Sequence, residues 1–167
     1  MRNEWILGGD PGRKGGIAVC DLGGTTYETW KWPGRGTPAE IEIAALELLR
    51  EIAERYPGVE ATVEQVHAMP GNGVTSMFNF GRAYCEMRMA CHAAGVPVAD
   101  VRPAAWQKAM GVEKRGTKSK TEHKNVLKGM AMSIVYAGTG VRKPLTHAVA
   151  DAVLIAEFAR RTLAGEA

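Results

Sequence analysis

Cysteine is scarce in this sequence, and long hydrophobic runs are absent. The three cysteines, Cys20, Cys85 and Cys91, are an odd set with no Cys-x-x-Cys pair. This pattern argues against a disulfide framework or a zinc site and indicates reduced thiols. No apolar run approaches the ~20 residues of a membrane-spanning helix, and the N-terminus lacks a signal-peptide pattern. We therefore expect a cytoplasmic protein that does not contact a membrane.

Net charge is also small. The chain has 21 Lys and Arg against 18 Asp and Glu, which gives a formal charge of +3 and a pI of about 8.8. This excess is too weak to indicate a nucleic-acid partner by itself. We find no internal repeat and no low-complexity tract. The length of 167 residues, with 46% apolar residues, predicts a single globular domain over residues 1–167.

The hydrophobic pattern predicts an α/β fold with a mixed five-stranded sheet flanked by helices. Three short apolar segments separated by glycine-rich turns predict an antiparallel meander, which strands alternating with helices follow. A right-handed crossover would place the fourth strand parallel to the first. The predicted strands cover residues 4–9, 16–21, 26–32, 59–66 and 97–101, and the predicted helices cover 38–56, 75–94, a short segment from 103, 121–136 and 146–163.

Acidic residues lie at the ends of two predicted strands. Asp10 ends the first strand, where Gly8 and Gly9 would leave the backbone open to a ligand. Glu64 lies in the hydrophobic fourth strand, where an ionised side chain needs a partner. An ordinary Asp-Pro-Gly turn and a structural salt bridge are the alternative interpretations. Parallel placement of the two strands would bring both carboxylates to the same edge of the sheet, where α/β proteins bind ligands.

The last predicted helix adds His147 and Asp151, which lie four residues apart and share one helical face. Helix-dipole compensation by Asp151 and a capping role for His147 are the alternatives. Together with Asp10 and Glu64, this set predicts two divalent ions, because Mg²⁺ prefers carboxylate oxygens and Mn²⁺ also accepts a histidine nitrogen. Two ions about 4 Å apart can activate water and stabilise the leaving oxygen in phosphodiester hydrolysis.

These motifs resemble those of the RuvC-type Holliday junction resolvases of the RNase H-like superfamily. In chain order they are Gly9-Asp10-Pro11-Gly12 with Gly15-Gly16, Val63-Glu64-Gln65-Val66, and His147 before Ala150-Asp151-Ala152. The segment 150–157, followed by Arg160-Arg161, looks most like phage and prophage members. The resemblance implies an RNase H-like fold and a homodimeric, metal-dependent endonuclease that places symmetric nicks in four-way DNA junctions. It also implies that Asp10, Glu64, His147 and Asp151 are the catalytic, metal-binding residues.

The sequence departs from the family pattern at two points. Many bacterial members space the last two ligands three residues apart, whereas His147 and Asp151 are four apart. Both spacings keep one helical face, and whether His147 binds metal or transfers protons stays open. The aromatic residue that often follows the strand-four glutamate is replaced by His67. Phe78 and Phe80 are then candidate wedges that stack at the junction core, with burial in the protein core as the alternative.

Positive charge is concentrated in residues 108–128, where seven Lys and Arg oppose two acids and leave a net charge of −2 for the rest of the chain. Basic residues in an irregular, glycine-containing segment suit phosphate contacts without base recognition, although a solvated loop is the alternative. We expect Lys118 and Lys120 to lie nearest the scissile phosphate. The predicted DNA contacts are Lys114, Arg115, Lys118, Lys120, Lys124, His67 and Phe78.

The predicted helix 75–94 is apolar around most of its circumference, which is more than one buried face requires. Burial by the sheet on one side and by a second subunit on the other would explain this excess. A methionine-rich core helix is the alternative. A two-fold homodimer would present two metal sites to a roughly two-fold four-way junction.

Three other functions are compatible with parts of the sequence. Sugar kinases and actin-like ATPases begin with a similar acid followed by glycines, but they need a second domain for which 167 residues leave no room. A nuclease acting on other branched DNA or on RNA–DNA hybrids would use the same chemistry. A non-catalytic module that binds branched DNA would use the basic segment alone.

Overall fold

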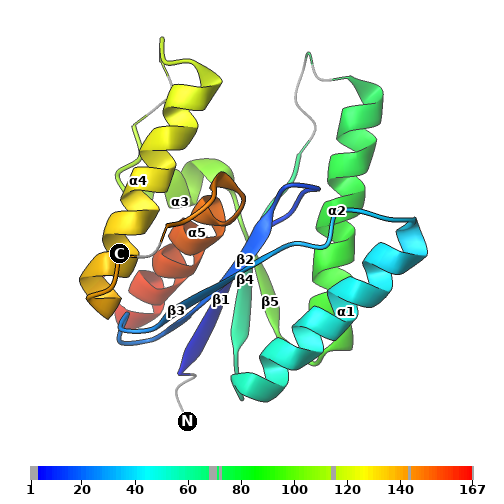
Figure 1. Ribbon diagram of the computed structural model, residues 1–167, viewed down its shortest axis with the longest axis horizontal. Coiled ribbons are helices and arrows are strands. Elements are labelled where there is room, and N and C mark those ends of the chain that lie inside the picture. The colour runs from blue at the N-terminus through cyan, green and yellow to red at the C-terminus, as the bar shows by residue number, and fades with distance from the viewer. Residues whose placement is uncertain (1–3, 68–70, 72, 114–115, 143, 167) are drawn as a thin grey trace.

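A five-stranded sheet lies between two layers of helices in the computed structural model (Figure 1). The structure describes residues 4–67, 71, 73–113, 116–142 and 144–166. The strands are β1 (Trp5–Asp10), β2 (Gly16–Asp21), β3 (Tyr27–Lys31), β4 (Glu60–Glu64) and β5 (Val98–Val101). The helices are α1 (Pro38–Arg55), α2 (Val74–Ala93), α3 (Pro103–Ala109), α4 (Lys120–Thr139) and α5 (His147–Ala164). Among the described residues, no helix is long and apolar enough to cross a membrane.

The strand order β3-β2-β1-β4-β5 confirms the predicted mixed sheet. The first three strands pair antiparallel, whereas β4 pairs parallel to β1 and β5 parallel to β4. In the β1–β4 register Gly9 lies opposite Val63. Asp10 and Glu64 are therefore the next residues on two neighbouring parallel strands. The fourth strand ends at Glu64, two residues before the end that we predicted.

Two helices begin with capping boxes formed by residues that are close together in the sequence. The Thr37 backbone N–H donates to the Glu40 carboxylate at 2.7 Å, and the Thr37 side chain accepts from the Glu40 backbone N–H, so α1 begins with a capping box. Ser119 and Glu122 form the same arrangement at the start of α4. That second cap begins α4 within the basic segment 108–128.

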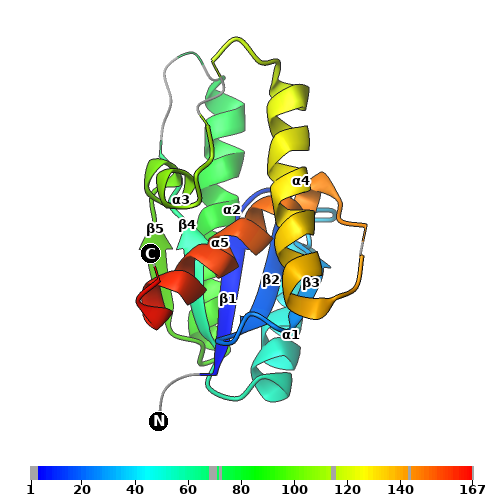
Figure 2. The same cartoon turned by 90° about the vertical axis from the view of Figure 1, so that its left-hand side faces the viewer.

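The two faces of the sheet bury separate hydrophobic clusters. Leu7, Ile17 and Val63 point toward α1 and α2, whereas Ile6 and Ala18 point toward α3, α4 and α5. This division follows from the alternation of side chains along each strand. Helix α5 is the most deeply buried helix, and Figure 2 shows it crossing the face of β1 and β2. Its first turns therefore lie over the carboxyl end of β1.

Two glycines allow α5 to approach the sheet closely. A Cβ atom on Gly8 would lie 2.3 Å from the carbonyl oxygen of Ala152, and one on Gly16 would lie 2.5 Å from that of Ala148. These neighbours are backbone atoms, so no side-chain rearrangement could make room. The expectation that Gly8 leaves the backbone open to a ligand is therefore wrong. The space above Gly8 is filled by α5, and a Cβ on Gly9 would meet the Met87 sulfur at 2.6 Å on the other face.

A buried ion-pair cluster holds the end of α5 against β3. Glu157 is 3% exposed and accepts hydrogen bonds from Tyr27 at 2.6 Å, Arg160 at 2.7 Å and Arg161 at 2.7 Å. Burial opposes ionisation of Glu157, but the hydrogen bonds from these three partners lower its pKa below the ordinary value. Arg160 and Arg161, which contributed to the family resemblance, thus stabilise the fold through their contacts with Glu157.

We expect Glu157→Ala to lower the free energy of unfolding by about 3 kcal/mol or more, because the substitution removes the buried partner of Arg160 and leaves only the exposed Glu166 paired with it. Urea unfolding followed by circular dichroism measures this change. Glu166→Ala is the matched control, because Glu166 pairs with the same Arg160 at 2.8 Å but has a 53% exposed side chain; it should cost about 1 kcal/mol or less. Equal losses in the two variants would contradict this account.

Candidate active site

Three carboxylates from distant parts of the chain meet at one edge of the sheet. Asp10 ends β1, Glu64 ends the neighbouring parallel strand β4, and Asp151 lies in the second turn of α5. Ile6, Gly8 and Asp10 alternate onto the sheet face that α5 covers, and the close contact between Gly8 and α5 fixes this direction.

Their electrostatic coupling follows from this placement. Burial raises the pKa of Asp10 well above its ordinary value, and the charges of Asp151 and Glu64 raise it further. Burial likewise raises the pKa of Glu64 to about 7, with a smaller contribution from Asp151 and an opposing hydrogen bond from Trp106. Burial also raises the pKa of Asp151. Three acids that interact in this way form one anionic centre.

Two side chains that were not among the predicted metal-binding residues interact with the carboxylates of this centre. The indole N–H of Trp106, on α3, donates to the Glu64 carboxylate at 2.7 Å, and Trp106 is only 1% exposed. This bond fixes one oxygen of Glu64 and favours its ionised form. Lys124, on α4, lowers the pKa of both Asp10 and Asp151. Lys124 was predicted as a DNA contact, whereas no sequence signal linked Trp106 to Glu64.

His147 occupies the first position of α5 and turns toward α4. Its Nε2 atom lies 2.9 Å from the Asn125 side-chain oxygen, and the residue is exposed. The positive field of His147 contributes to lowering the pKa of Asp151, after larger effects of Lys124 and His123. His147 is thus next to the anionic centre but hydrogen-bonded away from it. Whether it binds metal stays a prediction.

The chemistry of the donor set fits a hard divalent cation. Among the described residues, the Asp10 and Asp151 carboxylates accept no side-chain hydrogen bond and form no ion pair, although burial disfavours their charge. Oxygen-rich clusters of this kind suit Mg²⁺ or Mn²⁺. As the side chains stand, no group of three or more His, Cys, Asp and Glu in the described part of the chain is drawn together tightly enough to hold an ion. Cation binding would therefore require the carboxylates to close around it.

The other predicted DNA contacts occupy different positions. Lys118 pairs with Glu113 at 2.9 Å, and Lys120 is exposed at the start of α4. His67 is exposed just after β4. Phe78 is 70% exposed, so the alternative that it lies in the core is wrong. Lys114 and Arg115 lie outside the described residues.

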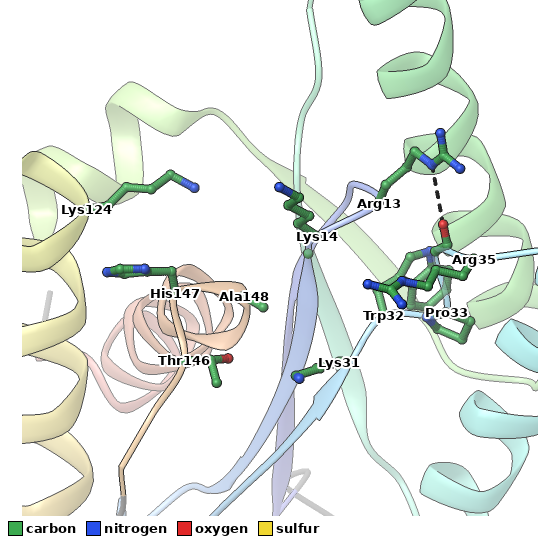
Figure 3. A pocket seen from close by; sticks show the side chains of 12 residues that line it. Arg13, Lys14, Lys31, Trp32, Pro33, Arg35, Lys124, Thr146, His147 and Ala148 are labelled. Atoms are coloured by element: carbon green, nitrogen blue, oxygen red, sulfur yellow. Dashed lines mark hydrogen bonds between the residues drawn. The ribbon is translucent and has the colours of Figure 1, made fainter. Parts of the chain in front are cut away.

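A basic cleft adjoins the anionic centre, and the sequence analysis missed most of it. Its volume is about 1080 Å³, and it lies between the β1–β2 turn, the β3–α1 loop and the starts of α4 and α5 (Figure 3). The cations that line it are Arg13, Lys14, Lys31, Arg35 and Lys124. The adjacent Arg13-Lys14 pair in the turn after Asp10 was the available sequence signal. Lys31 and Arg35 gave none, because they are single charges at the end of β3 and in the loop that follows it.

This strand order, with acids at the ends of β1 and β4, defines an RNase H-like fold of the RuvC type. The fold is similar to Thermus thermophilus RuvC in complex with Holliday junction substrate, with a TM-score of 0.68, 20% identity and 97% of each chain covered. A second Thermus thermophilus RuvC structure gives a TM-score of 0.64, 22% identity and the same coverage. The yeast mitochondrial Holliday junction resolvase Ydc2 gives 0.54 at 13% identity, over 95% of this chain and 80% of the other. No protein-family model and no curated protein matches the sequence.

The raised carboxylate pKa values make the stability of the metal-free protein depend on pH. Because the folded-state pKa of Glu64 is about 7, the folded protein keeps a proton that the unfolded chain loses near pH 4 to 5. This stabilisation is complete at low pH and is lost as the pH rises through about 7. Asp10→Asn removes one of the interacting charges. We expect the variant to be more stable than the wild type at pH 8, by on the order of 2 kcal/mol, with a smaller difference at pH 5.

Thermal unfolding with EDTA at both pH values, and again with Mg²⁺, tests this expectation. Mg²⁺ should raise the wild-type midpoint more than that of Asp10→Asn. Asp100→Asn, which removes an exposed carboxylate on β5, should show no such pH-dependent gain. A wild type that is insensitive to Mg²⁺ would count against a cation site here.

Proposed function

We propose that this protein is a metal-dependent endonuclease that resolves four-way DNA junctions by paired nicks. The observation that carries the proposal is the meeting of Asp10, Glu64 and Asp151 at one edge of an RNase H-like sheet. The similar structures support the substrate class, since one is RuvC with Holliday junction substrate and another is a Holliday junction resolvase. Junction resolution would place the protein in DNA recombination or repair.

Asp10, Glu64 and Asp151 would hold Mg²⁺, with Mn²⁺ as a substitute and two ions per site. Bound ions of this kind would supply Lewis acidity and would lower the pKa of a bound water below that of bulk water. The hydrogen bond from Trp106 orients Glu64 for this role and favours its ionised form against the effect of burial. Hydrolysis adds water across the P–O3′ bond, so that hydroxyl joins phosphorus and the departing 3′ oxygen takes a proton. His147, exposed beside Asp151, would either ligate metal or carry such a proton.

The substrate and cellular context belong to the same proposal. The anionic centre and Lys124 favour a catalytic protein over a binding module without activity, because a module needs no buried acids. Other branched DNA and RNA–DNA hybrids are the alternative substrates. The resemblance of segment 150–157 to phage members supports a phage or prophage origin, with action in the bacterial cytoplasm. Three free cysteines, two of them buried, agree with a reducing compartment.

We further propose a homodimer that forms through α2. Val74, Phe78, Cys85 and Met89 are exposed and lie within one narrow stripe of this helix. The exposed fractions of Val74, Phe78 and Met89 are 87%, 70% and 63%. The opposite face of α2 contributes Met87 and Cys91 to the core. An apolar stripe along a long helix suits a two-fold contact with the same stripe of a second copy.

Asp10→Asn and Glu64→Gln should abolish nicking and keep junction binding, because each substitution removes a carboxylate charge and preserves side-chain size. We expect at least about a 100-fold loss of the Mg²⁺-dependent rate, with binding within about threefold of the wild type. A cleavage assay on a four-way junction, a flap, a duplex and an RNA–DNA hybrid measures both activity and substrate class. Asp100→Asn serves as the matched control and should cleave normally. Undiminished cleavage by either site variant would reject the proposed roles.

Met89→Glu should convert the proposed dimer to a monomer, because it places a charge within the apolar stripe of α2. Sedimentation at several protein concentrations measures the assembly state. Ile43→Glu is the control, since Ile43 is a comparably exposed apolar residue (59%) on α1. A wild type that stays monomeric at high concentration would refute the interface, and the nuclease assay would still stand independently.

A further inference from the structure

The basic cleft has the charge and shape of a site for a polyanion. Five Lys and Arg residues line it together with His147, and no Asp or Glu is among its lining residues. Within the described part of the chain, none of the five cations forms a salt bridge, in contrast to Lys118, Arg88 and Arg160. A cluster of like charges without counter-ions is unfavourable unless an anion occupies it.

The cleft lies next to the anionic centre. Its lining includes Gly15, in the turn that follows Asp10, and Ala148, three residues before Asp151. Lys124 belongs to both places, because it lines the cleft and lowers the pKa of Asp10 and Asp151. Figure 3 shows the Lys14 and Lys124 side chains extending toward each other across the opening. A chain of phosphates bound at the carboxylates would therefore pass directly into this cleft.

Two loops that form the cleft are held in place before any ligand binds. Arg13 donates from its Nε atom to the Gly34 carbonyl oxygen at 3.3 Å, which ties the β1–β2 turn to the β3–α1 loop. Gly34 permits this contact, since a Cβ there would lie 2.3 Å from the Arg13 carbonyl oxygen. Trp32 also lines the cleft and is 4% exposed, yet its indole N–H has no hydrogen-bond partner within the described residues. Trp32 belongs to the hydrophobic cluster that packs against α1 and α2, so it forms a fixed wall of the cleft.

We propose that this cleft binds the sugar–phosphate backbone of the DNA strand that leaves the carboxylate site. The inference rests on the proposed nuclease function and adds a second DNA contact surface, separate from residues 108–120. The cleft is large, at about 1080 Å³, and all of its charged lining residues are basic. Lysine and arginine side chains without neighbouring acids can bind phosphate groups, and such contacts do not distinguish one base from another. The site would therefore add affinity and register to cleavage without adding sequence preference.

The test compares junction binding by the wild type, Lys31→Ala/Arg35→Ala and Arg50→Glu. Fluorescence anisotropy without divalent ions, over a series of KCl concentrations, gives the affinity and its salt dependence. The double variant should bind about 10-fold more weakly or worse, and the slope of log K against log salt should fall by about 2. Arg50→Glu changes net charge equally at an exposed position of α1, outside the cleft. It should leave the slope unchanged.

The outcomes separate this proposal from the nuclease proposal. An unchanged slope in the double variant, beside a wild type that nicks junctions with Mg²⁺, would overturn the cleft and leave the nuclease intact. A slope reduced by about 2 in a protein that nicks no junction would support the cleft and remove the nuclease. Micromolar ATP binding that the double variant abolishes, with normal junction binding, would overturn the cleft in favour of a nucleotide site. A wild type that binds no junction would overturn it as well.

Discussion

The close packing of α5 on β1 and β2 is the constraint on which the other features depend. Gly8 and Gly16 lack side chains where the backbone of α5 passes, and Ala148 and Ala152 keep the facing side of the helix small. This approach places Asp151 over the end of β1 and sets the boundary of the basic cleft at Ala148. A larger residue on either strand would lift the helix, and both features would be displaced together.

The same packing explains how an unfavourable group of charges is maintained. Burial raises the pKa values of Asp10, Glu64 and Asp151, and the neighbouring carboxylates raise those of Asp10 and Glu64 further, so the centre costs folding free energy when it is ionised. The hydrophobic clusters on the two faces of the sheet and the Glu157 cluster at the far end of α5 supply compensating stability. Functional sites commonly combine local strain or repulsion with a well-packed support. Here the support and the repulsive group share one helix.

Much of the fold and part of the candidate site follow from local sequence rules. Strand alternation and glycine-rich turns predicted the antiparallel meander, and the Thr37 cap predicted the start of α1. Crossover handedness predicted that β4 pairs parallel with β1, which put Asp10 and Glu64 at one edge. The rest depends on tertiary contacts without a local signal. Trp106 and Glu64 are 42 positions apart in the sequence, so their hydrogen bond has no local signal. Lys31 and Arg35 become part of a basic cleft only because the β1–β2 turn packs beside them. Helical periodicity could not distinguish a buried Phe78 from an exposed one. Gly8 was misread because an apolar strand does not reveal which backbone will pack on it.

The site joins the first and last elements of the chain, since β1 supplies one carboxylate and α5 another. Contacts of such high sequence separation form late and slowly, because a long loop must close before they add stability. During synthesis the sheet face containing Ile6, Ala18 and Cys20 lacks its main cover until α5 leaves the ribosome, because α3 and α4 supply only part of the same cluster. An incomplete nascent chain therefore lacks the full carboxylate set and exposes an apolar sheet face, which favours its binding by chaperones.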